Sequence, residues 1–183
     1  CLVAVAAAFV LIIIYIALRF RKIGGLSAGV MGVLALLHDA LMVFGVFVIF
    51  RIPLDDNFIA VVLMILGYSI NDTIVIYDRI RENKRLLGPK ASIAELVNIS
   101  INQSLTRSLN TSIATIIALS TICVVTIVCG VSSIVSFAFP MLVGMISGVY
   151  STIFIAGPLW VTWLEYKEKK AQQNKNSGKG KKK

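Results

Sequence analysis

The stretch FIAVVLMILGYSINDTIVIYDRIREN, Phe58–Asn83, decides the fold. About 20 apolar helical residues are needed to cross the ~30 Å hydrocarbon core of a bilayer, and the part from Phe58 to Tyr77 has this length. The part from Phe58 to Tyr77 contains one charged residue, Asp72. Several basic residues follow it at once, which is typical of the cytoplasmic end of a span. The stretch therefore predicts a membrane-spanning helix with a carboxylate inside the membrane.

Similar apolar runs occur along the whole chain. Of its 183 residues 57% are hydrophobic and 15% charged, against about 25% charged in soluble domains, and the mean hydropathy is +0.87. The expected spans are 1–18, 29–50, 58–78, 105–128 and 135–164. Lipid cannot satisfy backbone hydrogen bonds, and no run alternates polar and apolar residues as barrel strands do. We therefore expect an all-α, polytopic membrane bundle of five spans, forming one transmembrane domain over 1–166.

The connecting segments indicate an orientation, because basic loops tend to remain in the cytoplasm. Basic residues cluster after the first, third and fifth spans: Arg19, Arg21, Lys22, Arg79, Arg81, Lys84, Arg85, Lys90, Lys167, Lys169 and Lys170. The opposite turns hold Arg51 beside two acidic residues, and the uncharged GVSS at 130–133. We therefore expect the three basic ends to be cytoplasmic and Cys1 to be extracytoplasmic.

Two further segments have less regular patterns. Residues 91–103 place apolar side chains at roughly helical spacing between polar ones, which predicts an interfacial helix. The tail 167–183 is basic and has no apolar face, which predicts disorder. It is expected either to be simply solvated or to attract anionic lipid headgroups or a ribosome.

The amino terminus and the cysteines suggest a partial chain. The first residue is not Met, and no basic segment precedes the first run, so we expect a fragment rather than a signal peptide. A lipid-modified Cys1 is the alternative. Cys1, Cys123 and Cys129 lack the spacing of a metal site and are expected to be packing residues.

Ionisable residues within spans are costly and are functional candidates by default. With ~1.5 Å of rise per residue, Asp72 lies about 10 Å from Arg79 at the span's basic end. Arg107 enters the fourth span from the same side. It belongs to a polar stripe that we expect to face protein: Gln103, Arg107, Asn110, Thr111 and Thr115. If the two helices are neighbours, Arg107 could reach Asp72.

Two interpretations of this pair remain open. Burial and a nearby guanidinium shift the pKa of a carboxyl in opposite directions, so a small movement could change its protonation and the pair could relay protons. Alternatively, it is a fixed ion pair that locks two helices. The candidate supporting polar residues are His38, Asp39, Asn71, Thr73, Asn110 and Thr111. His38 and Asp39 could extend the relay or form a packed interface.

Small residues repeat at four-residue spacing in the last span: Gly144 with Gly148, and Ser147 with Ser151. Such faces allow helices to approach closely. We expect these four residues to serve helix packing.

Four segments carry a resemblance to the SecF family of the RND superfamily. They are GYSINDTIVIYDRIREN at 67–83, LLHDAL at 36–41, SINQSLTRSLNTS at 100–112 and GVYSTIFIAGPL at 148–159. The similarity extends to about Tyr166 and corresponds to the last five of six expected spans. We therefore expect this sequence to lack the first span and the outer domain of such proteins.

The resemblance implies a bacterial plasma-membrane subunit that pairs with SecD. With SecYEG, the pair would use the proton motive force to promote translocation of a polypeptide. Asp72 and Arg107 resemble the proton-relay carboxylate and its basic partner; the coupling ion is expected to be H+, with Na+ as an alternative. We expect no cofactor, no metal, no bound nucleic acid and no ATP-binding loop. The chain is therefore expected to be a transporter subunit rather than an enzyme. The alternative is that the chain forms half of a proton-driven RND exporter of lipids or small molecules. A third possibility is a scaffold that transports nothing.

Overall fold

The computed structural model describes residues 2–19, 25–88 and 92–180. Its helices are α1 (Leu2–Arg19), α2 (Gly25–Ile49), α3 (Asp56–Leu87), α4 (Ile93–Val128), α5 (Ser132–Ser151), the π-helix η3 (Thr152–Ala156) and α6 (Gly157–Gly180). No strand occurs in this described part. The predicted all-α class is therefore confirmed.

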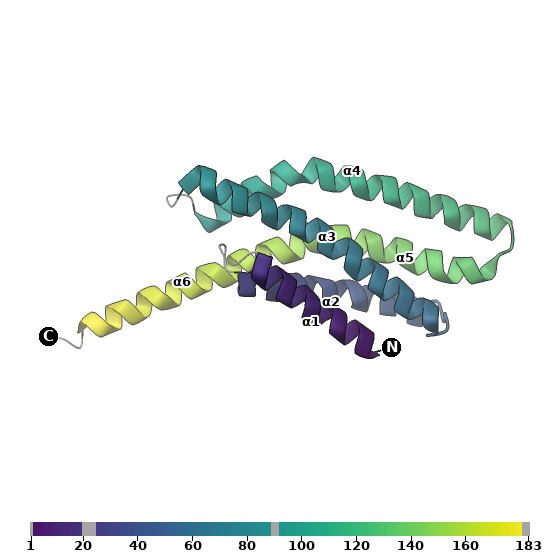
Figure 1. Cartoon of the computed structure of the whole chain (residues 1–183), viewed down its shortest axis with the longest axis horizontal. Helices are drawn as coiled ribbons and strands as arrows, with labels where there is room; N and C mark the ends of the chain where they lie inside the picture. Colours follow the sequence, from purple (N-terminus) through teal and green to yellow (C-terminus); the bar gives the residue numbers. More distant parts are fainter. Residues whose placement is uncertain (1, 20–24, 89–91, 181–183) are drawn as a thin grey trace.

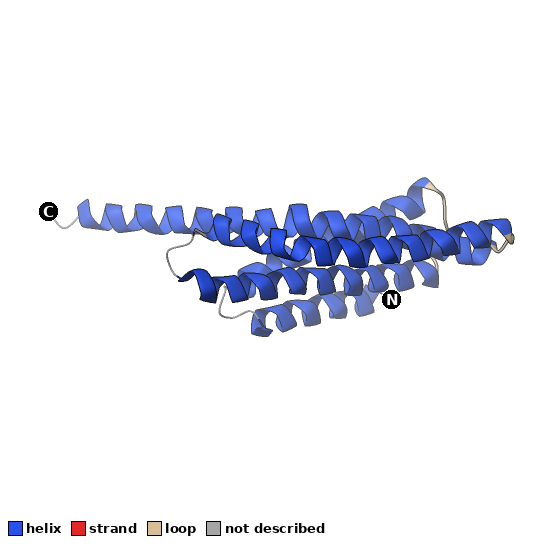
Figure 2. Ribbon diagram, turned by 90° about the horizontal axis from the view of Figure 1, so that it is seen from above, coloured by secondary structure: helices blue, strands red, loops and turns tan. Residues whose placement is uncertain are grey.

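The helices run alongside one another in a bundle (Figures 1 and 2). Asp55 caps the start of α3 by accepting a hydrogen bond from the Asn57 amide. Gly88 ends α3 with φ 69°, a conformation that glycine adopts without strain. An ion pair of 3.2 Å between Arg19 and Asp78 joins the carboxyl ends of α1 and α3. Basic residues that follow the first and third predicted spans thus lie at the same end of the bundle, whereas their cytoplasmic location stays a prediction; Arg21, Lys22 and Lys90 lie outside the described residues.

Four helical stretches of the described chain are long and apolar enough to cross a membrane. They are Ser27–Ile49, Asp56–Leu87, Ile93–Val128 and Ser133–Lys167. The last one combines α5, η3 and the start of α6. The first predicted span lies in α1, where only the shorter stretch Ala6–Arg19 qualifies as an apolar helix. A membrane bundle is supported, and the fifth span stays a prediction.

The residues expected to form an interfacial helix are instead the first turns of α4. Ser92 caps this helix by accepting from the Glu95 amide at 3.2 Å, and α4 then continues to Val128. No glycine or proline interrupts the sequence from 93 to 128, so nothing breaks the helix. From residue 93 the segment is therefore not a separate helix; residue 91 lies outside the described residues, and the interfacial location stays a prediction.

The tail also differs from the prediction of disorder from residue 167. In the structure α6 continues to Gly180 and projects beyond the bundle (Figure 2). Lys, Glu, Ala and Gln have good helix propensity. Extending an existing helix also needs no new nucleation, which an isolated segment would require. The composition shows that this tail lacks an apolar face, but it does not prevent helix formation.

The last span contains a π-helical turn between α5 and α6. η3 covers Thr152–Ala156 and lies directly before Gly157 and Pro158. Proline has no amide hydrogen, and its ring clashes with the carbonyl four residues earlier, here that of Phe154. A wider turn accommodates this clash, and such π-turns frequently occur at functional sites.

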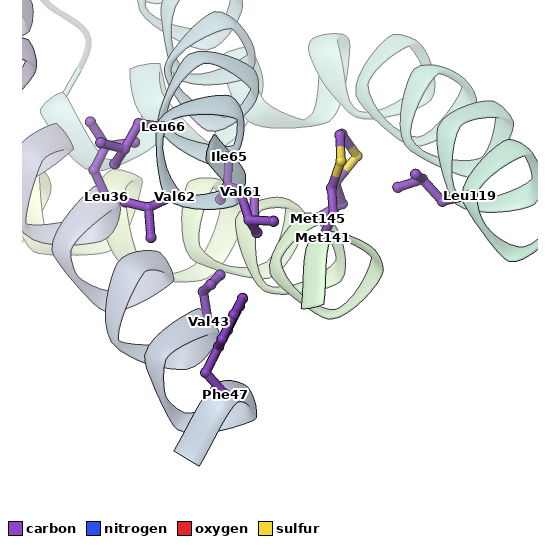
Figure 3. Close-up of a cluster of buried hydrophobic side chains, with 10 residues drawn as sticks. All are labelled: Leu36, Val43, Phe47, Val61, Val62, Ile65, Leu66, Leu119, Met141 and Met145. Atoms are coloured by element: carbon purple, nitrogen blue, oxygen red, sulfur yellow. The ribbon is translucent and has the colours of Figure 1, made fainter. Parts of the chain in front are cut away.

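The bundle is packed around an apolar cluster that joins four helices (Figure 3). Its buried members are Leu36, Val43 and Phe47 of α2, Val61, Val62, Ile65 and Leu66 of α3, Leu119 of α4, and Met141 and Met145 of α5. In lipid this packing stabilises through van der Waals contact rather than through the hydrophobic effect. Cys123 is buried as expected for a packing residue, whereas Cys129 is exposed.

A second cluster lies towards the basic end and contains a polar contact. Tyr77 and Trp160 are buried there, with ring centroids 5.8 Å apart. The Tyr77 hydroxyl donates to the Ala28 carbonyl at 3.0 Å and so ties α3 to α2.

We expect Tyr77→Phe to lower the free energy of unfolding by about 1 kcal/mol, the usual contribution of one hydrogen bond. Unfolding of the purified protein in mixed micelles measures this change. Tyr166→Phe is the matched control, because Tyr166 is 60% exposed on α6. Equal stabilities of the two variants would contradict a structural role for the hydroxyl.

Candidate functional site: two carboxylates inside the bundle

Asp72 lines a cavity of about 190 Å³ between α3 and α4. The Ser108 hydroxyl of α4 donates a hydrogen bond to Asp72 Oδ1. Asp72 Oδ2 is buried and has no hydrogen-bond partner among the described residues. One carboxylate oxygen is thus held by the neighbouring helix, while the other is left able to take up a ligand.

Arg107 lines the same cavity, which confirms that α3 and α4 are neighbours and that the two residues lie close together. The predicted direct ion pair is not formed, since no salt bridge between the described side chains joins Arg107 to Asp72. Arg107 and Val75 also line a second cavity of about 710 Å³, whose other walls include Asp78, Arg79 and further charged side chains. The Asp72 cavity therefore adjoins a polar cavity at the basic end of the bundle.

The polar stripe predicted on α4 lies at the edge of the contact with α3 and is largely exposed on this chain rather than packed inside the bundle. Gln103, Arg107, Asn110 and Thr111 are exposed on this chain, and Thr115 is half-buried. The face that packs against the bundle instead carries four serines at four-residue spacing: Ser100, Ser104, Ser108 and Ser112. Small side chains let helices approach closely in lipid, and this spacing in the sequence could have revealed the interface.

These serines also bind polar groups of α3. Ser112 accepts from the Tyr68 hydroxyl at 3.0 Å, and Ser100 accepts from Asn83 at 2.8 Å. Ser112 donates in turn to the carbonyl of Ser108 one turn earlier. The α3–α4 interface is therefore held by hydrogen bonds above and below Asp72.

A second carboxylate, Asp39, lies fully buried among α2, α3 and α5. Its side chain is 0% exposed. Oδ2 accepts from Ser69 at 2.8 Å and from Ser151 at 2.7 Å, and Oδ1 accepts from Ser147 at 2.8 Å. His38 Nδ1 lies 3.3 Å from Oδ1. The sequence identified Asp39 only as a supporting residue, but the structure places it at the centre of a polar cluster.

The four residues assigned to helix packing fulfil two roles. An added Cβ at Gly144 would lie 1.9 Å from Ile65 Cδ1, and one at Gly148 would lie 3.5 Å from Ser69 Cβ. The glycines thus let α5 approach α3 closely. Ser147 and Ser151, in contrast, are hydrogen-bond donors to Asp39.

The other candidate residues separate between the two sites. Asn71 and Thr111 line the Asp72 cavity. Asn110 is exposed and does not line it. Thr73 is buried and faces away from this cavity: its hydroxyl donates to the Ser69 carbonyl at 3.0 Å and lies 3.4 Å from the Thr152 hydroxyl. Thr73 therefore accompanies Asp39 rather than Asp72, because residues next to each other on a helix point in different directions.

Together, the apolar helices and the two carboxylates, one fully and one partly buried, define a polytopic membrane protein with ionisable groups inside its bundle. In such proteins these groups mark ion pathways and proton relays. Residues 1–166 match the family described as "Protein export membrane protein SecD/SecF, C-terminal". The chain belongs to this family.

The curated relatives that match this chain are named as protein translocase subunits. The chain is 44% identical to protein translocase subunit SecF of Alicyclobacillus acidocaldarius, over 92% of this chain and 53% of the relative. It is 41% identical to protein translocase subunit SecDF of Bacillus subtilis, over 93% of this chain and 23% of the relative. The crystal structure of SecDF, a translocon-associated membrane protein from Thermus thermophilus, matches with a TM-score of 0.75 and 38% identity, over 84% of this chain and 20% of that one. The chain thus spans about half the length of the SecF relative and is similar to translocase subunits.

Proposed function

We propose that the chain is the membrane part of a SecF-type subunit, which uses the proton motive force with SecD to promote polypeptide translocation through SecYEG. The observation that carries this proposal is the unpartnered, buried oxygen of Asp72 in a cavity shared with Arg107. A carboxylate oxygen left free inside a membrane span is costly unless it binds something. A proton is the ligand that a single carboxylate can bind without further ligands.

The geometry around Asp72 supports a proton relay. Ser108 fixes Oδ1, so a proton would bind at Oδ2. Arg107, in the same cavity, would stabilise the carboxylate once the proton has left. The adjoining cavity, walled by Asp78 and Arg79, provides an exit towards the basic end, which we assign to the cytoplasm of the bacterial plasma membrane. Each charge that crosses 100 mV supplies about 2.3 kcal/mol for this cycle.

The exposed polar stripe of α4 supports a partner subunit. Arg107, Asn110 and Thr111 are exposed on this chain although they lie within a predicted span. Polar residues at membrane depth almost always face protein or a water-filled cavity rather than lipid. We assign this face to SecD, and the SecDF relative carries both names in one protein.

The test uses the full-length protein that contains this chain, reconstituted with SecD and SecYEG in proteoliposomes. A preprotein is arrested part-way, and completion of its translocation is followed after a pH gradient or a sodium gradient is imposed. We expect acceleration with the pH gradient, and loss of it with a proton ionophore. Acceleration by the sodium gradient alone would assign Na+ as the coupling ion, and no response to either gradient would refute the proposal.

Ser108→Ala should reduce the gradient-driven part of translocation about tenfold. A hydrogen bond to a charged group contributes about 1.5–3 kcal/mol, and 1.4 kcal/mol corresponds to a factor of ten. The rate difference with and without the gradient measures the effect. Ser120→Ala, on the same helix and away from the Asp72 cavity, is the control and should behave as the parent. Equal rates for the two variants would show that Ser108 does not position Asp72.

A further inference from the structure

The Asp39 cluster is a separate site in the interior of the bundle. We propose that Asp39 is a second proton-binding carboxylate, and that its protonation loosens the attachment of the π-helical segment η3 to α3. Three serine hydroxyls from two helices converge on its two oxygens. Among the described side chains, no Lys or Arg pairs with it. An ionised carboxylate buried without a Lys or Arg partner is costly, which favours the binding of a proton at this site.

Serine hydroxyls can satisfy Asp39 in both protonation states, because each can donate or accept. Ser151 shows how the change would occur. Its hydroxyl lies 2.7 Å from Asp39 Oδ2 and also 3.2 Å from the Gly148 carbonyl of its own helix. With Asp39 ionised, Ser151 donates to the carboxylate. With Asp39 protonated at Oδ1, Oδ2 loses its negative charge and becomes a weaker acceptor, so Ser151 can donate to the Gly148 carbonyl instead.

His38 provides the route by which a proton reaches this buried site. Its side chain is 35% exposed, whereas that of Asp39 is 0% exposed, and Nδ1 lies 3.3 Å from Asp39 Oδ1. It is the chain's single histidine. An imidazole can take up a proton at one ring nitrogen and release one at the other, so His38 can transfer protons without moving.

The neighbouring helices present few other groups that could change this charge. α5 places Tyr150 against His38, with ring centroids 6.3 Å apart. α1 packs the apolar side chain of Ile16 against Gly29 of α2. α3 contributes Ser69 to the site, while its own carboxylate, Asp72, is bound by α4. Among the described residues, His38 is therefore the ionisable side chain that contacts Asp39.

The cluster is connected directly to the π-turn. Ser151 is the residue before η3, and Thr152 is its first residue. The Thr152 hydroxyl lies 3.4 Å from that of Thr73, which donates to the carbonyl of Ser69. Ser69 in turn donates to Asp39. A change in the orientation of the serines around Asp39 is thus transmitted to the contact between η3 and α3.

Infrared spectroscopy of the full-length protein in nanodiscs tests the proposal. A protonated carboxyl group gives a carbonyl band that an ionised one lacks. In the Asp72→Asn background we expect a pH-dependent band that disappears in the Asp72→Asn, Asp39→Asn double variant. Identical pH difference spectra for these two proteins would overturn the proposal. The measurement does not depend on translocation. The proposed function can therefore be refuted while this inference holds, and this inference can be refuted while the proposed function holds.

A serine variant keeps the test decisive if Asp39→Asn does not fold. Ser147→Ala removes one donor to the carboxylate and should change the pH midpoint of the band. The matched control is Ser136→Ala on the same helix, whose hydroxyl donates to the Ser133 carbonyl instead. An unchanged midpoint in Ser147→Ala would count against Asp39 as the source of the band.

Hydrogen exchange of the η3 amides tests the second half of the proposal. After correction for the intrinsic pH dependence of exchange, acidification should increase exchange at Thr152–Ala156 in the parent by about tenfold, since loss of one hydrogen bond to a charged group corresponds to at least this factor. Acidification should not change the exchange of these amides in the Asp39→Asn variant. A pH response that persists in Asp39→Asn would show that another group controls this segment.

Discussion

We expect the Asp72→Asn variant to insert and assemble as the parent does, and to lose gradient-driven translocation completely. Asparagine has nearly the same shape, and its amide oxygen can still accept from Ser108. It cannot bind and release a proton at Oδ2, where the parent has a buried and unpartnered oxygen. Asn71, next along the chain, lines the same cavity and shows that an amide is tolerated there. The rate of completing an arrested translocation, with and without a pH gradient, measures the loss.

Two further variants complete this experiment. Asp72→Glu retains a titratable carboxyl on a longer side chain, so we expect part of the stimulation to remain. Asp56→Asn changes an exposed carboxylate at the start of the same helix and should act as the parent. Full stimulation in Asp72→Asn would exclude the relay and favour a structural role for Asp72.

Gly144→Val should produce the largest loss of stability. An added Cβ at this position would lie 1.9 Å from Ile65 Cδ1 and 2.8 Å from Val43 Cγ2. Ile65 and Val43 are both 0% exposed and belong to the apolar cluster that joins the helices, so neither can easily move aside. Overpacking of a dense core costs about 1–3 kcal/mol, and valine adds two more carbon atoms beyond Cβ. We expect a destabilisation of about 3 kcal/mol in unfolding from mixed micelles.

Gly45→Val is the matched control, because an added Cβ at Gly45 meets nothing within 4 Å. Its stability should differ little from that of the parent. Adding Ile65→Ala to Gly144→Val should restore part of the lost stability, since it removes the side chain that the valine meets. If the double variant were no more stable than Gly144→Val, the close approach of α5 to α3 would not be the cause.

The apolar helices and the basic segments that follow them could be predicted from the sequence, because both signals are local. A run such as 58–78 is apolar whatever lies beside it, and the basic residues after it are equally independent of packing. Helix boundaries were less predictable. Residues 93–103 and 105–128 have different compositions, yet they form one helix because no residue between them stops it.

The site could be predicted only in part. Asp72 is conspicuous as a charge within an apolar run, and its neighbour Arg107 follows from the order of the spans. Ser108 was not predicted, because the serine face of α4 was overlooked in favour of its more polar stripe. That stripe, including Asn110, is largely exposed on this chain, so polarity alone did not reveal which face of α4 packs against α3.

The sequence by itself determined that this protein is a helical membrane bundle of the SecD/SecF family with a carboxylate at residue 72. Only the tertiary structure decided that Asp39 is bound by Ser69, Ser147 and Ser151, and that Thr73 belongs with it. The physical reason is that hydropathy depends on each residue alone. Which face of a helix meets which neighbour depends instead on close packing among all of them, such as the contact of Gly144 with Ile65.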